Sequence, residues 1–313
     1  MRAYKFQKKY LANKIYYLNS QRPLSSLENG QALLIVLLSM AVILTVVLSI
    51  LSRSVTDVAV TSRGEESVRA FSAAEAGVEQ ALIGAPTSGT LTGSSFDAEV
   101  VDIGKNLTSF VYPLGVESGD TATVWLVSHD DNGSLVCDGA NPCHTGSSVM
   151  VCWGADQPYP DPSLMPAIEV ISLYLNTPGN NSTARVARAT FDGNSSRRSL
   201  NNFDVANASG CNIDTESFAY SANVDFAAMG IPSSVYSTPN GMQLLAVRML
   251  YNTDTTHKLG VSTFSSIFPS QGTHVNSTGI SGEAIRKVSV LRLFPDLPPT
   301  FYSAVFAPVG VSK

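Results

Sequence analysis

Residues 32–51 read ALLIVLLSMAVILTVVLSIL, a run without a charge, a glycine or a proline. A helix needs about 20 apolar residues to cross the roughly 30 Å hydrocarbon core of a bilayer, and this run supplies that length. A buried helix of a soluble domain is rarely apolar on every side for so long. The run therefore predicts a single transmembrane helix.

The residues that flank this run predict its orientation. Lys and Arg occupy positions 2, 5, 8, 9, 14 and 22, opposed before the run only by Glu28, whereas Arg53 and Asp57 follow the run. Because basic residues are retained on the cytoplasmic side, we expect a cytoplasmic N-terminus, a single-pass inner or cytoplasmic membrane protein and an extracytoplasmic C-terminal part. The run exceeds the roughly 7–15 apolar residues of a cleaved secretory signal, which favours a retained helix.

A helical pattern continues beyond the apolar run until a glycine and a proline end it near residue 84. Apolar residues recur at spacings of three and four, which places them on one stripe. Four of them are predicted to form a face that docks on a folded domain: Val68, Phe71, Val78 and Leu82. We expect one continuous helix over residues 31–84, transmembrane over 32–51 and amphipathic over 52–84. An anchor followed by a separate stalk helix is the alternative.

From about residue 85 the pattern changes to short β-prone runs separated by Gly, Pro, Asn and Asp. TATVWLVSH (121–129), AIEVISLYL (167–175) and AIRKVSVLRLF (284–294) are examples, and Asn132-Gly133 predicts a hairpin turn. Many strands and few helices predict an antiparallel, β-sandwich-like domain over residues 85–313, so the fold class of the whole chain is α+β.

Composition agrees with an exported β-rich domain. Only 14% of the residues are charged, against roughly 25% in average globular proteins. The formal net charge is −5, so there is no basic excess and nucleic acid is not an expected partner.

All four cysteines follow the apolar run: Cys137, Cys143, Cys152 and Cys211. Their placement predicts an oxidising compartment in which disulfides persist. Of the three possible connectivities, we favour Cys137 with Cys143 across a short loop, which leaves Cys152 for Cys211. His144 adds a potential zinc ligand, but the spacing does not match paired C-x2-4-C knuckles, so no metal and no cofactor are expected.

No motif for catalysis is present. The histidines lie outside any HExxH pattern, and neither GxSxG nor a phosphate-binding loop occurs. We expect the histidines to be solvated loop side chains: His129, His144, His257 and His274. The SSRRS stretch (195–199) is likewise expected to be a solvated loop. We therefore predict that the chain is not an enzyme, and an exported hydrolase ranks last among its functions.

The N-terminal quarter resembles the type IV pilin-like superfamily, and most nearly the PilX-type minor pilins and the related tip-most pseudopilin of type II secretion. The basic leader ending in Gly30, the start QALLIVLL and the stretch ESVRAFSAAEAGVEQAL (66–82) carry this resemblance. It implies that residues 1–30 are a cytoplasmic leader and that a prepilin peptidase cuts between Gly30 and Gln31. It also implies that other pilin-like subunits are partners.

Two residues depart from this family's pattern. The fifth mature position, usually Glu in major pilins, is Ile35, and the first, often Phe, is Gln31. Since burying an unpaired ammonium group is costly, a subunit without that Glu is poorly suited to repeat along a filament. Ile35 therefore indicates either a minor or tip role, or a protein that is never cut or assembled.

Two classes of function remain. The first is a minor pilin-like subunit of a type IV pilus or related secretion filament that displays an extracellular β domain; adhesion, assembly priming, DNA uptake and secretion all fit this class. The second is an uncleaved, signal-anchored surface protein whose β domain binds an unidentified ligand such as a glycan.

Overall fold

The structure, a computed structural model, describes residues 28–155, 161–296 and 298. The chain divides into two compact units, Met1–Gly64 and Glu65–Lys313. The first unit is helical throughout its described part, and the second contains all the strands. This boundary differs from the one expected after residue 84, because the last turns of the helix pack against strands. The predicted leader lies outside the described residues up to position 27.

Helix α1 (Glu28–Leu82) is a single element of 55 residues, and the predicted long apolar helix is therefore present. The helix continues through Arg53 without a break. Gly84 ends it in a left-handed conformation with φ +70°, and the N–H of Ala85 donates to the carbonyl of Gln80 at 2.9 Å. Glycine adopts this conformation without the penalty that a Cβ imposes, which explains why the helix stops here.

Strands make up most of the second unit. They are β1 (Ser88–Leu91), β2 (Ser94–Asp102), β3 (Ser109–Val111), β4 (Thr121–Trp125), β5 (Ser128–His129), β6 (Leu135–Val136), β7 (Ser148–Trp153), β8 (Ala167–Leu175), β9 (Ala184–Asp192), β10 (Asp204–Val205), β11 (Cys211–Ile213), β12 (Glu216–Phe218), β13 (Tyr220–Asp225), β14 (Met242–Leu250), β15 (Leu259–Ser262), β16 (Gly272–Ser281) and β17 (Ala284–Leu293). Short helices join some of them: η1 (Pro162–Leu164), η2 (Asn181–Thr183), α2 (Ser195–Asn201) and α3 (Ser233–Tyr236).

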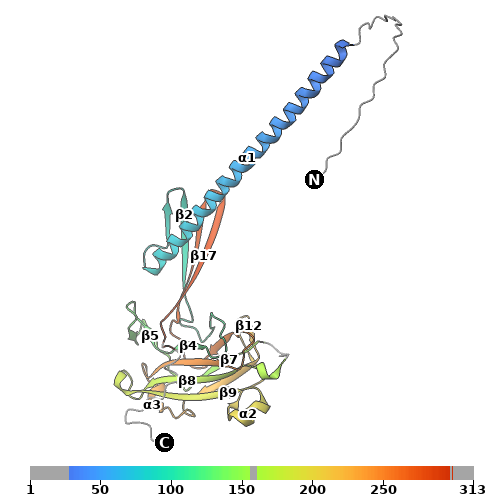
Figure 1. The fold of residues 1–313 in the computed structure, drawn as a ribbon. Helices are drawn as coiled ribbons and strands as arrows, with labels where there is room; N and C mark the ends of the chain where they lie inside the picture. The colour runs from blue at the N-terminus through green and yellow to red at the C-terminus, as the bar shows by residue number, and fades with distance from the viewer. Residues whose placement is uncertain (1–27, 156–160, 297, 299–313) are drawn as a thin grey trace, which may run out of the picture. The chain divides into compact units, whose positions relative to one another are not determined.

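Four strands form a sheet in the order β1-β2-β16-β17, with every pairing antiparallel. In Figure 1, β2 and β17 lie alongside the C-terminal part of α1. Gly282 and Glu283 form the two-residue turn between β16 and β17, where Ser281 pairs with Ala284. We call residues 65–82 of α1 together with this sheet the stem.

The remaining strands, which we call the head, form two larger sheets and two short ribbons. The sheet orders are β10-β9-β8-β14-β4 and β13-β7-β15-β3, and the ribbons are β11-β12 and β5-β6. All these pairings are antiparallel except that of β10 with β9.

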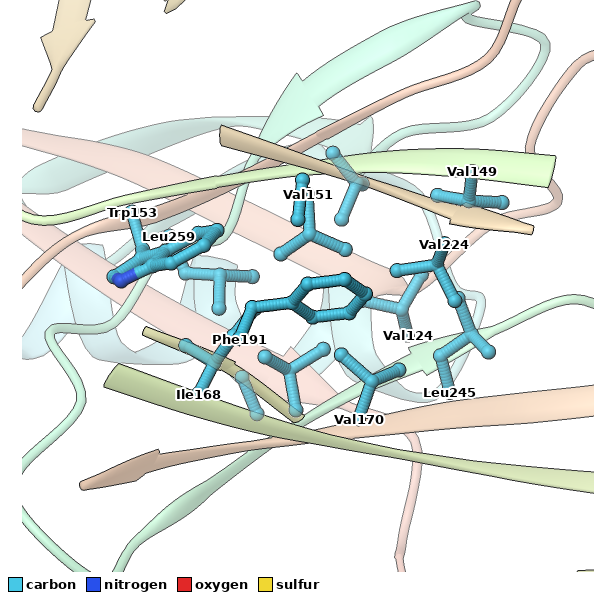
Figure 2. Close-up of a cluster of buried hydrophobic side chains, with 14 of the residues drawn as sticks. Val124, Val149, Val151, Trp153, Ile168, Val170, Phe191, Val224, Leu245 and Leu259 are labelled. Carbon is cyan, nitrogen blue, oxygen red and sulfur yellow. The ribbon is translucent and has the colours of Figure 1, made fainter. Parts of the chain in front are cut away.

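Both larger sheets contribute side chains to one hydrophobic cluster. Figure 2 shows Ile168 and Val170 from one sheet near Val151, Trp153 and Leu259 from the other. Aliphatic and aromatic residues on alternating positions of each strand fill this core, as expected for sheets with one buried face. The described chain is thus a long apolar helix followed by a mostly antiparallel domain of several sheets, in agreement with the α+β class.

The predicted hairpin is present in the head, where β5 pairs with β6. Of the two predicted turn residues, Gly133 is left-handed at φ +81° and Asn132 is not. The turn is held instead by the side chain of Asp130, whose Oδ1 accepts hydrogen bonds from the N–H groups of Asn132 at 2.9 Å and Ser134 at 2.8 Å. Such a side-chain acceptor mimics a backbone turn.

Candidate assembly helix and its docking sheet

The predicted processing site lies in the first turn of α1. Gly30 and Gln31 are both exposed, and a Cβ added to Gly30 would meet nothing within 4 Å. The first four N–H groups of a helix have no partner within it, so a helix that restarts at Gln31 loses little.

The segment over residues 32–51 exposes large apolar side chains in every direction. Within the described residues, α1 is the one helix that is long and apolar enough to cross a membrane. Its two central hydroxyl groups bond to its own backbone: Ser39 Oγ donates to the Val36 carbonyl at 2.9 Å and Thr45 Oγ1 donates to the Val42 carbonyl at 2.8 Å. A polar group inside hydrocarbon requires such an internal partner. Ile35 is also exposed and adds no charge to this surface.

The docked face of α1 consists of small residues and differs from the predicted face. Ala70, Ala73 and Ala74 are fully buried, and Val78 is 6% exposed, whereas Val68 and Phe71 are 66% and 46% exposed. Leu82 packs at the edge of the cluster around Val78. The prediction was therefore wrong for Val68 and Phe71, because the sheet is contacted there by the small residues Ala70, Ala73 and Ala74, and large apolar residues are accepted only farther along, at Val78 and Leu82.

Glycines explain why the sheet accepts only small residues there. A Cβ on Gly279 of β16 would lie 1.9 Å from the carbonyl oxygen of Ala70, so the two backbones are in direct contact. A Cβ on Gly77 of the helix would lie 2.3 Å from Ser277 Oγ and 2.8 Å from the ring of Phe96. At such positions glycine allows a backbone approach that any side chain would block.

Polar groups tie both ends of this docked segment to the sheet. Arg286 of β17 donates from Nε and Nη2 to Ser67 Oγ at 2.9 and 2.6 Å. Arg292 Nη1 donates to the Leu82 carbonyl at 3.4 Å, at the end of α1 where carbonyls lack partners within the helix. A guanidinium at a helix C-terminus also interacts favourably with the helix dipole.

Gln271 connects the stem sheet to the head. This residue precedes β16, is 1% exposed and pairs with the edge of β4. Its Oε1 accepts from the Trp125 N–H at 2.7 Å, while its Nε2 donates to the carbonyls of Trp125 at 3.0 Å and Pro269 at 2.8 Å. The amide side chain thus satisfies backbone groups that a neighbouring strand would otherwise satisfy.

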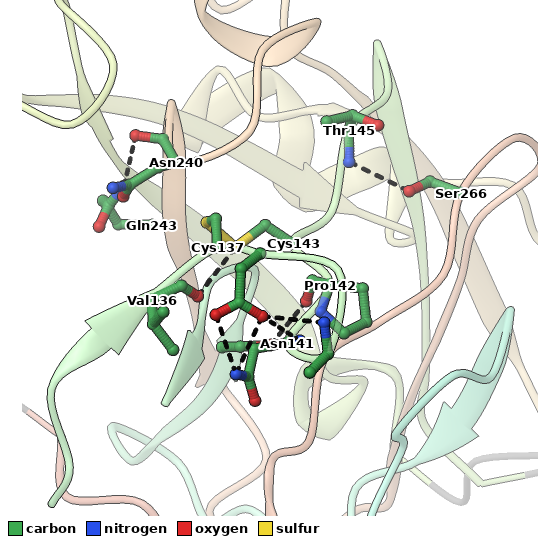
Figure 3. Close-up of a disulfide and its surroundings, with 12 residues drawn as sticks. Val136, Cys137, Asn141, Pro142, Cys143, Thr145, Asn240, Gln243 and Ser266 are labelled. Atoms are coloured by element: carbon green, nitrogen blue, oxygen red, sulfur yellow. Dashed lines mark hydrogen bonds between the residues drawn. A yellow bond between two sulfur atoms is a disulfide. The ribbon is translucent and has the colours of Figure 1, made fainter. Parts of the chain in front are cut away.

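Both disulfides lie in the head. Cys137 pairs with Cys143 and Cys152 pairs with Cys211, with Cα–Cα distances of 5.5 and 6.2 Å, which is the favoured connectivity. Figure 3 shows the first disulfide closing the loop that contains Asn141 and Pro142. The second joins β7 to β11 and lies in a hydrophobic cluster with Phe218. In the described residues no group of His, Cys, Asp and Glu could hold a metal ion.

The histidines are not the solvated loop residues that were expected. His144 is 1% exposed and stacks on Phe268, and burial lowers its pKa to about 4 against a smaller opposing effect of the Ile267 backbone. Burial also lowers the pKa of His257, opposed by Asp254. His129 and His274 are both half-buried; His129 stacks on Phe294, and the ring of His274 hydrogen bonds to Ser289 Oγ at 2.6 Å. A neutral, buried ring packs like an aromatic residue.

The SSRRS stretch is also more ordered than expected. It forms α2, and Arg197 makes a bidentate ion pair with the buried carboxylate of Asp192 at 2.7 and 2.8 Å. Burial would raise the pKa of Asp192, but hydrogen bonds from Arg197, the Asn194 backbone and Asn201 outweigh it and hold the pKa below its ordinary value. The ring of Tyr251 lies 3.8 Å from the guanidinium carbon of Arg197. Arg197 therefore has a structural role and is not a solvated loop residue.

A groove of about 590 Å³ lies where the end of α1, the stem sheet and the β5-β6 ribbon meet. Its walls include Asp130, Asp131, Asn141 and Arg292. Asp130 already accepts the turn hydrogen bonds of the ribbon, and Arg292 binds the helix end. The groove is thus lined by many polar side chains, and Ser128 and His129 of β5 are also among them.

Neither a protein-family model, nor a curated protein, nor a solved structure matches the chain. Function is therefore argued from the helix, its docking sheet and the head themselves.

Proposed function

We propose that this chain is a minor pilin-like subunit of a type IV pilus or a related secretion filament. A prepilin peptidase removes residues 1–30 by cutting between Gly30 and Gln31. The segment over residues 32–51 holds the subunit in the cytoplasmic membrane, with its N-terminus inside. Other pilin-like subunits pack against the helix from Gln31 to Leu82, and the head is displayed outside, where its two larger sheets form a β-sandwich.

The observation that carries this proposal is the composition of α1. One uninterrupted helix combines an exposed apolar run with a C-terminal part that is buried against a sheet. An ordinary membrane anchor needs only the run, so the packing of residues 65–82 of the same helix against a sheet is an added feature. It suits a subunit in which one helix serves both the membrane and the folded domain.

The head supports a display role. Two disulfides suit an extracytoplasmic compartment, and the buried His144, His257 and Asp192 serve packing instead of catalysis. Ile35 leaves the apolar run without a carboxylate for a neighbouring N-terminal amine. We therefore place the subunit at or near the tip of a filament and assign it no enzymatic activity.

The processing step can be tested with Gly30→Leu. A leucine at this position meets no neighbour in the structure and favours helix, but it crowds the backbone that the peptidase must approach. We expect a prepilin peptidase co-expressed with the chain to yield a protein starting at Gln31, and the variant to stay full-length. Gly64→Leu is the matched control, since Gly64 also has open space around it. Intact mass spectrometry measures both.

An unprocessed N-terminus in the unchanged chain, with an active peptidase present, would remove the pilin proposal. The chain would then fit the second class, a signal-anchored surface protein, and the groove beside the β5-β6 ribbon would be the first place to look for its ligand.

A further inference from the structure

Strand β17 is an edge of the stem sheet. Among the described residues it pairs with β16 alone, over all ten of its residues. Because Ser281 and Ala284 flank a two-residue turn, they form a hydrogen-bonded pair, and such pairs alternate along an antiparallel ladder. The N–H and C=O groups of residues 285, 287, 289, 291 and 293 therefore point away from β16. Among the described residues, no backbone or side-chain group bonds to them.

The charge of β17 restricts what can pair with this edge. The strand contains Arg286, Lys287 and Arg292 and has no Asp or Glu. Arg286 and Arg292 face the helix, where they bond to Ser67 and Leu82, while Lys287 is exposed on the opposite face of the sheet. A second β17 brought alongside would oppose cations with cations, which is unfavourable. An acidic strand at the same edge would place anions opposite these cations, which is favourable.

The other side of the same sheet shows what such an acidic strand looks like. β1 pairs with β2 only as far as Asp97, so in the described part of the chain the exposed residues 99–102 have β16 on one side and no strand on the other. β2 carries Asp97, Glu99 and Asp102 and no Lys or Arg. Its charges are thus opposite in sign to those of β17.

We propose that the β17 edge is an interaction surface that adds an acidic, extended strand from another protein chain. Main-chain hydrogen bonds to the outward groups of β17 supply the affinity, and the positive charge of the strand, with Lys287 as its exposed cation on the face away from the helix, selects an acidic partner. The chain's own residues 299–313 contain one Lys and no Asp or Glu, so their charge does not suit this edge. The surface does not depend on processing at Gly30.

The probe for this surface is a cyclic hairpin peptide with one strand of the sequence SSFDAEVVD, since a preformed strand avoids most of the ordering cost. Its control carries Asn and Gln in place of Asp and Glu. Binding to the full-length protein in detergent micelles is followed by fluorescence anisotropy. We expect the acidic peptide to bind at least about 5-fold more tightly than the neutral one at low salt, with the difference lost at high salt.

Three substitutions at one position separate charge from backbone. Lys287→Ala should weaken binding of the acidic peptide about 3-fold, and Lys287→Glu about 10-fold, because one attraction becomes a repulsion. Lys287→Pro removes an outward N–H without touching the β16 ladder, so it should weaken binding about 5-fold beyond Lys287→Ala. Unchanged thermal unfolding shows that each variant is folded.

Several results would overturn the proposal. These are absence of binding, equal binding of the acidic and neutral peptides, or equal binding by the alanine and proline variants. Binding that appears only after residues 299–313 are deleted would also overturn it, since the edge would then belong to the chain's own terminus. The processing experiment at Gly30 is unaffected by any of these results.

Discussion

The stem and the head use opposite packing strategies. In the stem, the fully buried helix residues are Ala70, Ala73 and Ala74, and glycine lets the helix backbone touch the sheet. In the head, large side chains fill the space between the sheets, among them Trp153, Tyr220 and Phe268. The stem should therefore be destabilised by side chains that are made larger, and the head by side chains that are made smaller.

The largest expected effect is a loss from the head core. Trp153→Ala should lower the free energy of unfolding by about 3–5 kcal/mol, because it leaves a cavity and frees the Pro166 carbonyl that the indole N–H binds at 3.0 Å. Urea unfolding followed by circular dichroism measures this. A change below about 1 kcal/mol would mean that the head does not depend on large side chains.

The second expected effect depends on pH and again concerns the head. With a folded-state pKa of about 4 and an ordinary value of 6.5, His144 binds its proton more readily in the unfolded chain. The contribution of His144 to stability should therefore fall by about 3 kcal/mol as the pH drops from about 6.5 to about 4, and this loss should saturate below that range. His144→Phe keeps the stacking on Phe268 and should remove this part of the slope, while His257 and His129, whose pKa values burial also lowers, retain their own parts.

Asp192 changes stability at a lower pH than His144 does. Its lowered pKa gives a stabilisation that is present above its ordinary value of 3.8 and is lost only as the pH falls through the folded-state value. A slope that persists unchanged between pH 6.5 and 4 in His144→Phe would contradict the role of His144.

A gain of one methyl group should harm the stem. Gly279→Ala should cost about 1–3 kcal/mol, because the new Cβ would overlap the Ala70 carbonyl and push the helix away from the sheet. Limited proteolysis near residues 65–82 and thermal unfolding detect the change. Gly64→Ala, where nothing lies within 4 Å, is the control and should not destabilise the protein.

The smallest effects distinguish the two faces of the docked helix. Val78→Ala should cost about 1 kcal/mol, because it removes buried apolar surface, whereas Phe71→Ala should stay within about 0.5 kcal/mol despite the larger side chain. A larger loss for Phe71→Ala than for Val78→Ala in thermal unfolding would return Phe71 to the docking face, where the sequence analysis placed it together with Val78.

Some strands could be read from the sequence and others could not. AIEVISLYL became β8 over the same residues, because a β-prone run bounded by turn residues carries its own signal. β16 (GTHVNSTGIS) was missed, since its buried positions are Gly, Ser and Val and its other positions are polar except for Ile280. Such a strand is stabilised by its contact with the helix that covers it. The local sequence of the strand carries no information about that contact.

The sequence by itself determined the long apolar helix, its end at Gly84 and the change to strands. These depend on local properties: hydrophobic length, a left-handed glycine and the spacing of β-prone runs. The sequence favoured one of three cysteine pairings, and the tertiary structure decided it, since Cys152 and Cys211 are 59 residues apart. Only the tertiary structure decided which face of α1 is buried, that His144 and Arg197 are internal, and that Gln271 connects stem and head. The reason is physical: each of these depends on the size and polarity of residues distant in sequence, and Gly279 and Gly77 favour alanines over Phe71 at the contact between helix and sheet.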